Sequence, residues 1–482
     1  MISFFAGAAT VLAFAPVGVY PFAPITLALL VHRWSEASPK RCFLAGFWFG
    51  LGFFLAGVSW VYVSMSQFGG MPMPLAVLST FVFCAFLALF PAAAGWLQAR
   101  VPVPLAVRVL LLIPAAWTLF EWLRGVIFTG FPWISIGYAA TGWPLQGYAP
   151  LGGVYLMTFL SLALAGAVWL LFKRVRPILA FAVFAIAIGG GEALRHVEWS
   201  TPVGEPFDAA LLQGNVPQEM KFRPERYARI LETYARLTEE SKARLIVLPE
   251  TAVPNWLDQV DPAYLGRLAS VARRNGGDLL LGLAYREPPN FYYNSVVSLG
   301  TAPPQIYHKH HLVPFGEFVP PGFAWLMRTV DIPMSNFSRG RLAPPPMNVA
   351  GQRVAINVCY EDVFGDEIGA RLPEATVLVN VSNVAWFGDS LAPAQHLQMT
   401  RLRAIETRRM HLAATNTGVT AAIDRDGRLI RRVPSFTEGL LEVRAQGYTG
   451  TTPYVRFADS PILALCLGLL AAWTIVGRIR RK

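Results

Sequence analysis

Long apolar segments dominate the first two hundred residues of the chain. Seven of them follow one another, and an eighth lies near the end, at Ile2–Val19, Tyr20–Val31, Phe43–Val63, Leu75–Leu97, Leu105–Leu123, Leu151–Phe172, Ile178–Ala193 and Ile462–Val476. A helix that crosses a membrane needs about 20 apolar residues. The pattern predicts a polytopic α-helical membrane domain of about eight spans, with seven in residues 1–200 and a C-terminal helix at 460–478. Tyr20–Val31 is short, so a re-entrant hairpin with the first segment is an alternative.

The pattern changes between residues 206 and 446, where short apolar runs alternate with amphipathic stretches. Strands are predicted by the runs at 209–212, 245–248, 279–283, 295–299, 354–358, 376–381 and 412–415. Helices are predicted at 226–242, 262–275 and 394–409. Strands mixed with helices in this way indicate a layered α/β domain, and its length is sufficient for a core of its own.

Composition and charge support a membrane protein. Hydrophobic residues make up 54% of the chain and charged residues 15%, against about 25% charged residues in soluble proteins. Residues 206–445 contain 26 of the 41 basic and 24 of the 30 acidic side chains. The net charge of +11 therefore lies mostly beside the apolar segments, which indicates membrane topology and not a nucleic-acid partner.

Basic residues also predict the orientation of the membrane domain. They follow the second, fourth and sixth apolar segments and end the chain, at His32–Arg33, Lys40–Arg41, Arg100, Lys173–Arg176 and Arg478–Lys482. With eight spans these positions share one side, which the positive-inside rule makes cytoplasmic. The 206–446 domain is then on the outer side, which is the periplasm of a Gram-negative cell.

Metal and disulfide chemistry are not predicted. Cys42, Cys84 and Cys466 lie inside apolar runs, where a thiol is an ordinary packing group. No CxxC motif occurs, and no His/Cys spacing suits zinc. The cluster 308–311, HKHH, stands between a strand-like run and a proline turn. We expect no metal and no cofactor.

A fourth cysteine, Cys359, directly follows the strand-like run 354–358. It is either a buried packing residue or a nucleophile presented at the end of a strand. Glu250 closely follows another apolar run, and Lys309 has Glu317 eight positions later. A nucleophilic thiol needs a base that takes its proton and a cation for the oxyanion that forms on attack. These residues therefore make catalysis a serious alternative to packing.

The chain order Glu250, Lys309, Cys359 resembles the catalytic triad of the nitrilase superfamily. Residues 382–409, SNVAWFGDSLAPAQHLQMTRLRAIETRR, and 415–418, TNTG, also resemble the segment that follows the cysteine in that superfamily. The resemblance implies an αββα sandwich for residues 206–446.

The chain as a whole resembles the apolipoprotein N-acyltransferase family, in which a nitrilase-like domain stands between transmembrane segments. The matching motifs are GAATVLAFAPVGVYPFAP at 7–24, TGFPW at 129–133, LLQGNVPQEMKF at 211–222, LPETAVP at 248–254, KHHLVPFGEFVP at 309–320 and CYEDVFG at 359–365. One departure is Phe222, where the family usually has tryptophan after the lysine.

This resemblance implies a reaction and a set of roles. A membrane phospholipid donates an acyl chain through a cysteine thioester, and the acceptor is the α-amino group of the N-terminal S-diacylglyceryl cysteine of an apolipoprotein. Glu250 would be the base, Cys359 the nucleophile and Lys309 the oxyanion cation. Supporting roles fall to Glu317 and Glu361, as ion-pair partners that orient Lys309 or the loop, and to Tyr360, near which a backbone N–H would help to hold the oxyanion. The enzyme would be a monomer in the bacterial inner membrane.

Candidates for substrate binding are Trp133, Phe222 and Trp386. Trp133 belongs to the aromatic-rich loop 126–150, which is either an interfacial aromatic belt or a lipid entrance. Two other functions remain open at this stage. A membrane-tethered nitrilase-type amidase would share the triad but has no need of seven preceding spans. A transporter or receptor would carry ionisable residues inside the membrane, where these segments have almost none.

Overall fold

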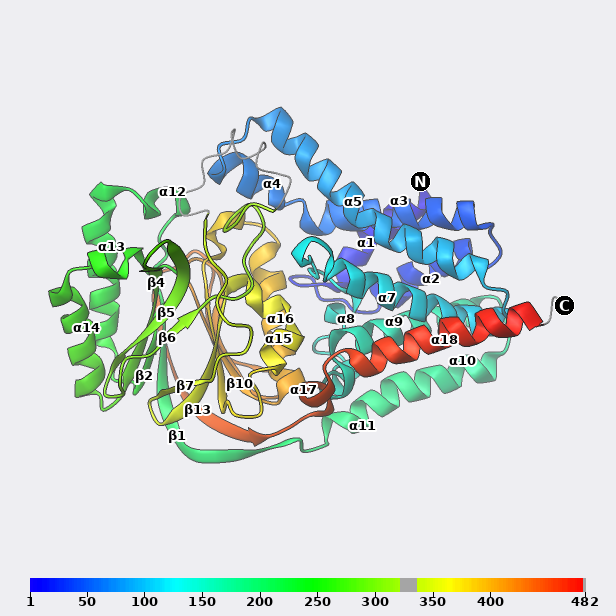
Figure 1. The fold of residues 1–482 in the computed structure, drawn as a ribbon. Coiled ribbons are helices and arrows are strands. Elements are labelled where there is room, and N and C mark those ends of the chain that lie inside the picture. Colours follow the sequence, from blue (N-terminus) through cyan, green and yellow to red (C-terminus); the bar gives the residue numbers. More distant parts are fainter. Residues whose placement is uncertain (321–335, 480–482) are drawn as a thin grey trace. The chain divides into compact units, whose positions relative to one another are not determined.

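The computed structural model describes residues 1–320 and 336–479 (Figure 1). The chain folds into two compact units. One contains Met1–Tyr62, Pro72–Val197 and the chain from Arg456 onward, and the other contains Val63–Met71 and Glu198–Val455. Residues 480–482, which end the basic C-terminal stretch, lie outside the described residues.

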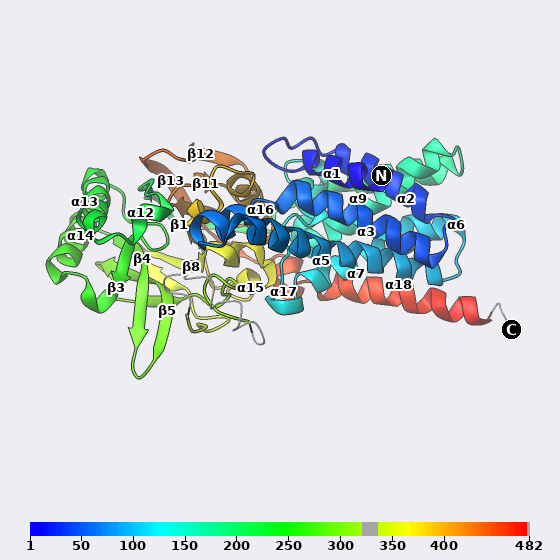
Figure 2. The same cartoon turned by 90° about the horizontal axis from the view of Figure 1, so that it is seen from above.

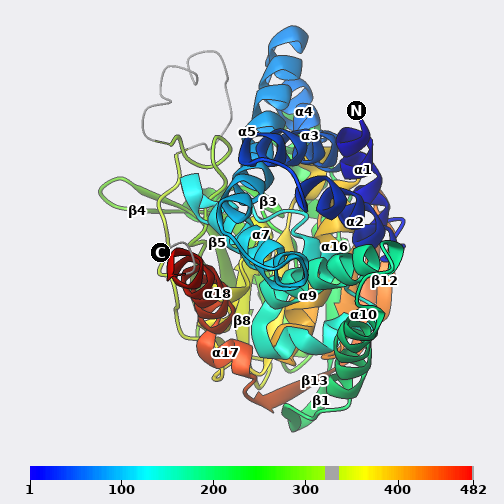
Figure 3. The ribbon, with the colours of Figure 1, turned by 90° about the vertical axis from the view of Figure 1, so that its right-hand side faces the viewer.

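The first unit is helical. Its main helices are α1 (Ile2–Thr10), α2 (Phe22–Trp34), α3 (Pro39–Val58), α5 (Met73–Arg100), α7 (Ile113–Arg124), α9 (Ala149–Phe172), α10 (Pro177–Phe184), α11 (Gly191–Arg195) and α18 (Ser460–Ile479). Helices α3, α5, α7 and α18 run side by side (Figure 2), and Figure 3 shows the unit nearly end-on. Each predicted apolar segment is therefore largely helical.

The predicted number of eight spans is not confirmed. Within the described residues, five segments are long and apolar enough to cross a membrane: Pro39–Val58, Met73–Arg100, Leu105–Arg124, Pro144–Phe172 and Pro177–Arg195. Three apolar helices are shorter, at Ile2–Ala13, Phe22–Trp34 and Ser460–Ile475. The first segment stops early because Phe14 has extended backbone and Pro16 and Gly18 follow it, and neither residue favours the interior of a helix.

Small residues allow α1 and α3 to approach closely. A Cβ atom on Gly7 would lie 1.9 Å from the carbonyl oxygen of Phe49, and one on Gly52 would lie 2.0 Å from that of Phe4. Glycine therefore lets the two backbones touch, as is common where helices pack within membranes.

Glu121 and Arg124, three residues apart near the end of α7, form a buried ion pair at 3.8 Å. Glu121 also accepts hydrogen bonds from the Thr158 hydroxyl at 2.6 Å and the main-chain N–H of Ile136 at 3.0 Å. Arg124 donates to the carbonyl oxygen of Trp133 at 2.9 Å. The two charges satisfy each other and together fix the backbone of the loop that follows α7.

The second unit is built on two β-sheets. One has the strand order β13-β1-β2-β4-β5-β6, with β3 beside β4, and the other has the order β12-β11-β10-β9-β8-β7. The strands of the first sheet are β1 (Ser200–Gln213), β2 (Leu245–Val247), β3 (Val253–Trp256), β4 (Asp278–Glu287), β5 (Phe291–Gly300), β6 (Ile306–His308) and β13 (Gly439–Gly450). Those of the second are β7 (Met347–Val349), β8 (Gln352–Val358), β9 (Val377–Ser382), β10 (Met410–Thr415), β11 (Thr420–Ile423) and β12 (Leu429–Val433).

Alternate residues of each strand pack into different layers. In β8, Val354, Ile356 and Val358 join the core between the sheets, while Ala355 packs outward against Ile368. Helices α13 (Pro224–Glu240) and α14 (Pro262–Arg274) cover the first sheet, and α15 (Gly365–Gly369) and α16 (Ala392–Thr407) cover the second (Figure 1). The period of two residues thus gives each central strand two buried faces, and the expected αββα sandwich is confirmed.

All seven predicted strands and all three predicted helices of this unit are present. The prediction missed β3, β6, β7, β11, β12 and β13, and also the short helices α12 (Gln218–Lys221) and α15. Strands of three or four residues are too short to show alternation. β12 was missed because it is an exposed edge strand with two consecutive arginines.

Strand direction determines where polar groups gather. β8, β9 and β10 are parallel neighbours, and β2 is parallel to both β1 and β4. The carboxyl ends of parallel strands meet at one edge of a sheet, where open α/β sheets usually bind ligands. The residues that follow β2 and β8 include Glu250 and Cys359.

Candidate active site

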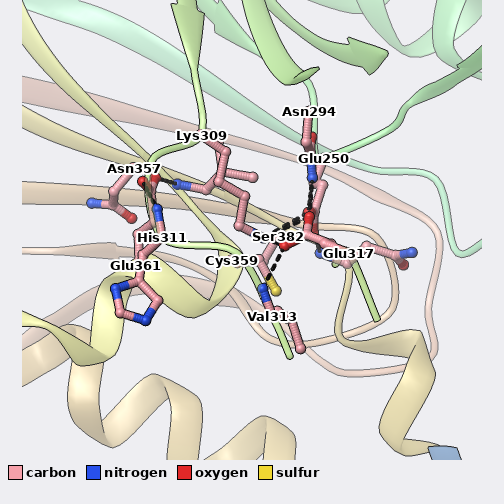
Figure 4. Close-up of polar contacts among 12 residues, drawn as sticks. Glu250, Asn294, Lys309, His311, Val313, Glu317, Asn357, Cys359, Glu361 and Ser382 are labelled. Atoms are coloured by element: carbon pink, nitrogen blue, oxygen red, sulfur yellow. Dashed lines mark hydrogen bonds and ion pairs between the residues drawn. The ribbon is translucent and has the colours of Figure 1, made fainter. Parts of the chain in front are cut away.

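Glu250, Lys309 and Cys359 come together in the sandwich. Glu250 follows β2, Lys309 is the first residue after β6, and Cys359 is the first residue after β8. Figure 4 shows them gathered with Glu317 and Asn294. Two different sheets therefore supply the nucleophile and its polar neighbours.

The backbone is strained at Cys359 and at the residue that follows Glu250. Cys359 has φ of 53°, and Thr251, directly after Glu250, has φ of 50°. Residues other than glycine rarely adopt this left-handed region, and those that do cluster at functional sites. The strain at both ends of the cluster supports a functional role over simple packing of the cysteine.

The Lys309 ammonium is the buried cation of the cluster, with only 1% of the residue exposed. It lies 2.8 Å from a carboxylate oxygen of Glu317 and 3.5 Å from one of Glu250. Burial alone would lower the pKa of Lys309, but the charges of Glu317 and Glu250 outweigh it and raise the pKa. Lys309 is therefore positively charged at any physiological pH.

Asn294 joins the two carboxylates and was missed by the sequence analysis. Its side-chain amide donates at 2.7 Å to Glu250 and at 2.7 Å to Glu317. The main-chain carbonyl oxygen of Asn294 accepts from the main-chain N–H of Lys309 at 2.9 Å. It lies in β5, and the only sequence signal is a buried-type strand interrupted by an amide. The Asn294 side chain thus joins the two carboxylates, and its main chain holds the residue that supplies the cation.

The Cys359 thiol is free and partly exposed. Removal from bulk water raises the pKa of Cys359, and the negative charge of Glu250 raises it further, while Lys309 and the main-chain N–H of Asn383 oppose the shift. The thiol is therefore protonated at neutral pH. That N–H of Asn383 also donates to Glu250 at 2.7 Å, so it lies beside both groups.

Glu361 connects the cysteine turn to the lysine loop. Its fully buried carboxylate accepts from the main-chain N–H groups of Val358 at 2.7 Å and His310 at 2.7 Å. The Tyr307 hydroxyl lies 2.7 Å away, and Arg371 is 3.5 Å away. The Glu361 carboxylate therefore binds donors on both sides of Lys309 and also the residue before Cys359.

Tyr360 and the histidine cluster have packing partners. Tyr360 is buried and its ring meets those of His311 and Phe364 edge-on. His311 lies 2.7 Å from Glu367, and His310 lies 2.8 Å from the carbonyl oxygen of Gly340. Among the described residues, no group of three His, Cys, Asp or Glu side chains is arranged to hold a metal ion.

A second polar layer lies behind the cysteine turn. The carbonyl oxygen of Cys359 lies 3.3 Å from Nε2 of His396 and 3.5 Å from the amide nitrogen of Asn380. His396 is 3.9 Å from Asp362, whose carboxylate also accepts from the Thr400 hydroxyl. These contacts hold the main chain at Cys359 in its strained conformation. The sequence contained no signal for them because they come from β9 and α16.

The three candidates for substrate binding lie in different surroundings. Trp133 belongs to the helical unit and is only 2% exposed, with its ring 5.0 Å from that of Trp60. Trp386 is partly exposed, and its carbonyl oxygen accepts from the Ser64 hydroxyl at 2.7 Å. Phe222 is partly exposed at the end of α12. The described contacts of Trp133 are those of a packing residue, and Trp386 and Phe222 have more accessible rings.

Substitution of Glu361 by glutamine tests its connecting role. We expect Glu361→Gln to lower the free energy of unfolding by about 2–5 kcal/mol, because it removes a buried anion from several donors and one arginine. The matched control is the exposed Glu374→Gln, which should change it by less than about 0.5 kcal/mol. Urea unfolding in detergent micelles, followed by tryptophan fluorescence, measures both variants. Equal midpoints for the two would contradict the role of Glu361.

Comparison with known proteins agrees with this geometry. Residues 6–167 match the family model described as the apolipoprotein N-acyltransferase N-terminal domain, and residues 208–454 match the carbon-nitrogen hydrolase model. An apolipoprotein N-acyltransferase of Nitrosomonas europaea is 48% identical, covering 97% of this chain and 95% of the relative. Another from Methylococcus capsulatus is 45% identical, covering 95% and 92%.

A solved amidase of the nitrilase superfamily, from Nesterenkonia, is similar over 54% of this chain and 97% of its own, with 19% identity and a TM-score of 0.38. The two family models cover the helical part and the sandwich in turn, and the bacterial relatives span both. The chain therefore belongs to the apolipoprotein N-acyltransferase family.

Proposed function

We propose that this protein transfers an acyl chain from a membrane phospholipid to the α-amino group of the N-terminal S-diacylglyceryl cysteine of an apolipoprotein. One observation carries the proposal: a thiol, a carboxylate and a buried ammonium meet in a nitrilase-type sandwich whose chain also contains an apolar helical unit. The names of the relatives supply the acceptor class.

The first half-reaction would form a thioester. Glu250 takes the proton of the Cys359 thiol, and the sulfur attacks the ester carbonyl of the phospholipid. The tetrahedral intermediate collapses, the bond to the glycerol oxygen breaks, and that oxygen takes the proton from Glu250 as the lysophospholipid leaves. The raised pKa of Cys359 explains why a neighbouring base is required.

The second half-reaction would pass the acyl chain to nitrogen. The neutral α-amine attacks the thioester carbonyl, Glu250 accepts a proton from the attacking nitrogen, and the bond between carbon and sulfur breaks. The thiolate then takes that proton back from Glu250, and the amide product leaves. A ping-pong scheme of this kind needs one nucleophile and one base.

Lys309 would stabilise the negative oxygen in both tetrahedral intermediates. Its ammonium is fixed by Glu317 and by the loop that Glu361 holds, so little reorganisation is needed when charge develops. In this scheme Glu317 and Glu361 position the cation, and Tyr360 packs beside the cysteine turn.

The helical unit would keep the acyl chains out of water. Moving an acyl chain into water costs about 0.8 kcal/mol per CH₂ group. We therefore place the helices in the bacterial inner membrane and the sandwich in the periplasm, where lipid and lipoprotein meet the site at the bilayer surface. Trp386 and Phe222 are candidates for contact with substrate, and Trp133 would act through the packing of its loop. All of the catalytic groups come from one chain, so a monomer is sufficient.

Mass spectrometry of the intact protein after incubation with phospholipid tests the thioester. We expect an added acyl mass on Cys359 and none on Cys359→Ala. Glu250→Gln should also lack the adduct, because the thiol keeps its proton. An acylated and fully active Glu250→Gln enzyme would show that another group is the base. Release of product from small amides without acyl transfer would instead identify an amidase.

Loss of the Lys309 charge should slow both half-reactions. Removal of one oxyanion donor typically costs about 10²–10³ in rate, so Lys309→Met should lose about that factor per folded molecule in acylation and in transfer. Lys309→Arg keeps the charge in a different shape, and we expect partial recovery. Single-turnover rates, normalised to folded protein, measure both steps. If Lys309→Met loses stability only, the lysine is an ion-pair partner and not part of the reaction.

Membrane orientation can be tested with a reporter enzyme that is active only outside the cytoplasm. Alkaline phosphatase fused after Gln352 should be active, because the basic residues beside the apolar segments lie on the cytoplasmic side. A fusion after Lys482 should be inactive. The reverse result would overturn the periplasmic placement of the sandwich.

A further inference from the structure

Lys221 is a second buried lysine beside the cluster. It ends the short helix α12, only 2% of it is exposed, and its ammonium donates to the main-chain carbonyl oxygen of Glu250 at 3.1 Å. Within residues 1–320 and 336–479, no carboxylate lies at ion-pair distance from it. Burial of an ammonium without a partner carboxylate is costly, so the position calls for a reason other than packing.

The helix of Lys221 is tied to the site at a second point. The side chain of Gln218 accepts at 2.9 Å from the amide of Asn383, and the main-chain N–H of Asn383 donates to the Glu250 carboxylate. Helix α12 therefore reaches Glu250 in two ways. Lys221 binds the main-chain carbonyl oxygen of Glu250, and Gln218 binds Asn383, whose main-chain N–H fixes the Glu250 carboxylate. A shift of Lys221 would move the base.

The charges of the cluster indicate what Lys221 adds. Glu250 and Glu317 carry two negative charges, and Lys309 supplies one positive charge. When the proton passes from Cys359 to Glu250, the S–H bond breaks and an O–H bond forms, but the net charge stays at minus one. A protonated Lys221 brings that charge to zero. When the Cys359 proton is lost to solvent, the net charge of the buried site is then minus one and not minus two, which favours the thiolate.

We propose that Lys221 is a positioning residue of the active site, a second cation that fixes the main chain of Glu250 and stabilises the Cys359 thiolate. This inference rests on the proposed roles of Glu250 and Cys359. The proposed role of Lys221 differs from that of Lys309, whose ammonium is paired with carboxylates and would stabilise the developing oxyanion.

The protonation of Lys221 gives the proposal a pH dependence. Burial lowers the pKa of Lys221 to about 8, and the charges of Glu250 and Cys359 oppose that shift. On its own helix, Glu219 is exposed to solvent. The positive charge is therefore complete well below pH 8 and is lost as the pH rises through that value.

Alkylation of Cys359 by iodoacetamide measures the thiolate without any lipid substrate. The full-length protein in detergent micelles is treated between pH 5.5 and 10, and peptide mass spectrometry separates Cys359 from the three buried cysteines. Lys221→Gln keeps a hydrogen-bond donor but removes the charge. We expect its Cys359 to react about tenfold more slowly at pH 7, which corresponds to about one pKa unit. The exposed Lys242→Met should react like the unaltered protein.

Lys221→Arg gives the complementary result. Arginine stays charged to pH 10, so the alkylation rate of this variant relative to the unaltered protein should rise above pH 8. An unchanged rate in folded Lys221→Gln would overturn the proposal. If Lys221→Gln does not fold, the proposal is overturned when the ratio of the Lys221→Arg alkylation rate to that of the unaltered protein does not change with pH. Failure of the acyl-transfer reaction itself would appear in the lipid adduct experiment and leave these rates unaffected.

Discussion

The buried ammonium of Lys309 is the constraint on which the rest of the site depends. A cation removed from water requires anions nearby, and here it is paired with Glu317 and lies near Glu250. Those two carboxylates would repel each other without the cation and the shared Asn294 amide. The same arrangement leaves Glu250 beside a thiol that is protonated at neutral pH. One buried charge thus helps to position both carboxylates, including the proposed base Glu250.

Rigidity comes from buried polar contacts that do not take part in the reaction. Glu361 holds main-chain donors on both sides of the site, and His396 lies behind the carbonyl of Cys359. Such contacts cost free energy if only partly satisfied. They also maintain the left-handed backbone at Cys359, which an isolated strand would not keep.

The sequence predicted the parts of the site that have a local signal. An apolar run that ends in Cys359 or comes just before Glu250 is visible in any window of ten residues. The short strand-like runs indicated a layered α/β domain, but the αββα sandwich itself followed only from the family resemblance. The contacts of Glu361 and Asn294 were not visible, because their partners come from strands that meet only in the folded domain. Lys221 was not identified either, since a lysine in a polar stretch is usually solvated.

The predicted number of membrane spans was not confirmed, and part of the reason is physical: proline and glycine shorten the first helix, and hydropathy alone does not show this.

The pairing of β1 with β13 couples the site to the completion of synthesis. Ser200, near the start of the sandwich, pairs with Gly450 near its end, and these strands close the sheet that presents Glu250. Contacts so distant in sequence form late in folding. A nascent chain that lacks β13 has an open edge in that sheet, so the sheet that presents Glu250 is still incomplete. The site around Glu250 and Cys359 can therefore be complete only after the whole sandwich, β13 included, has been synthesised and folded.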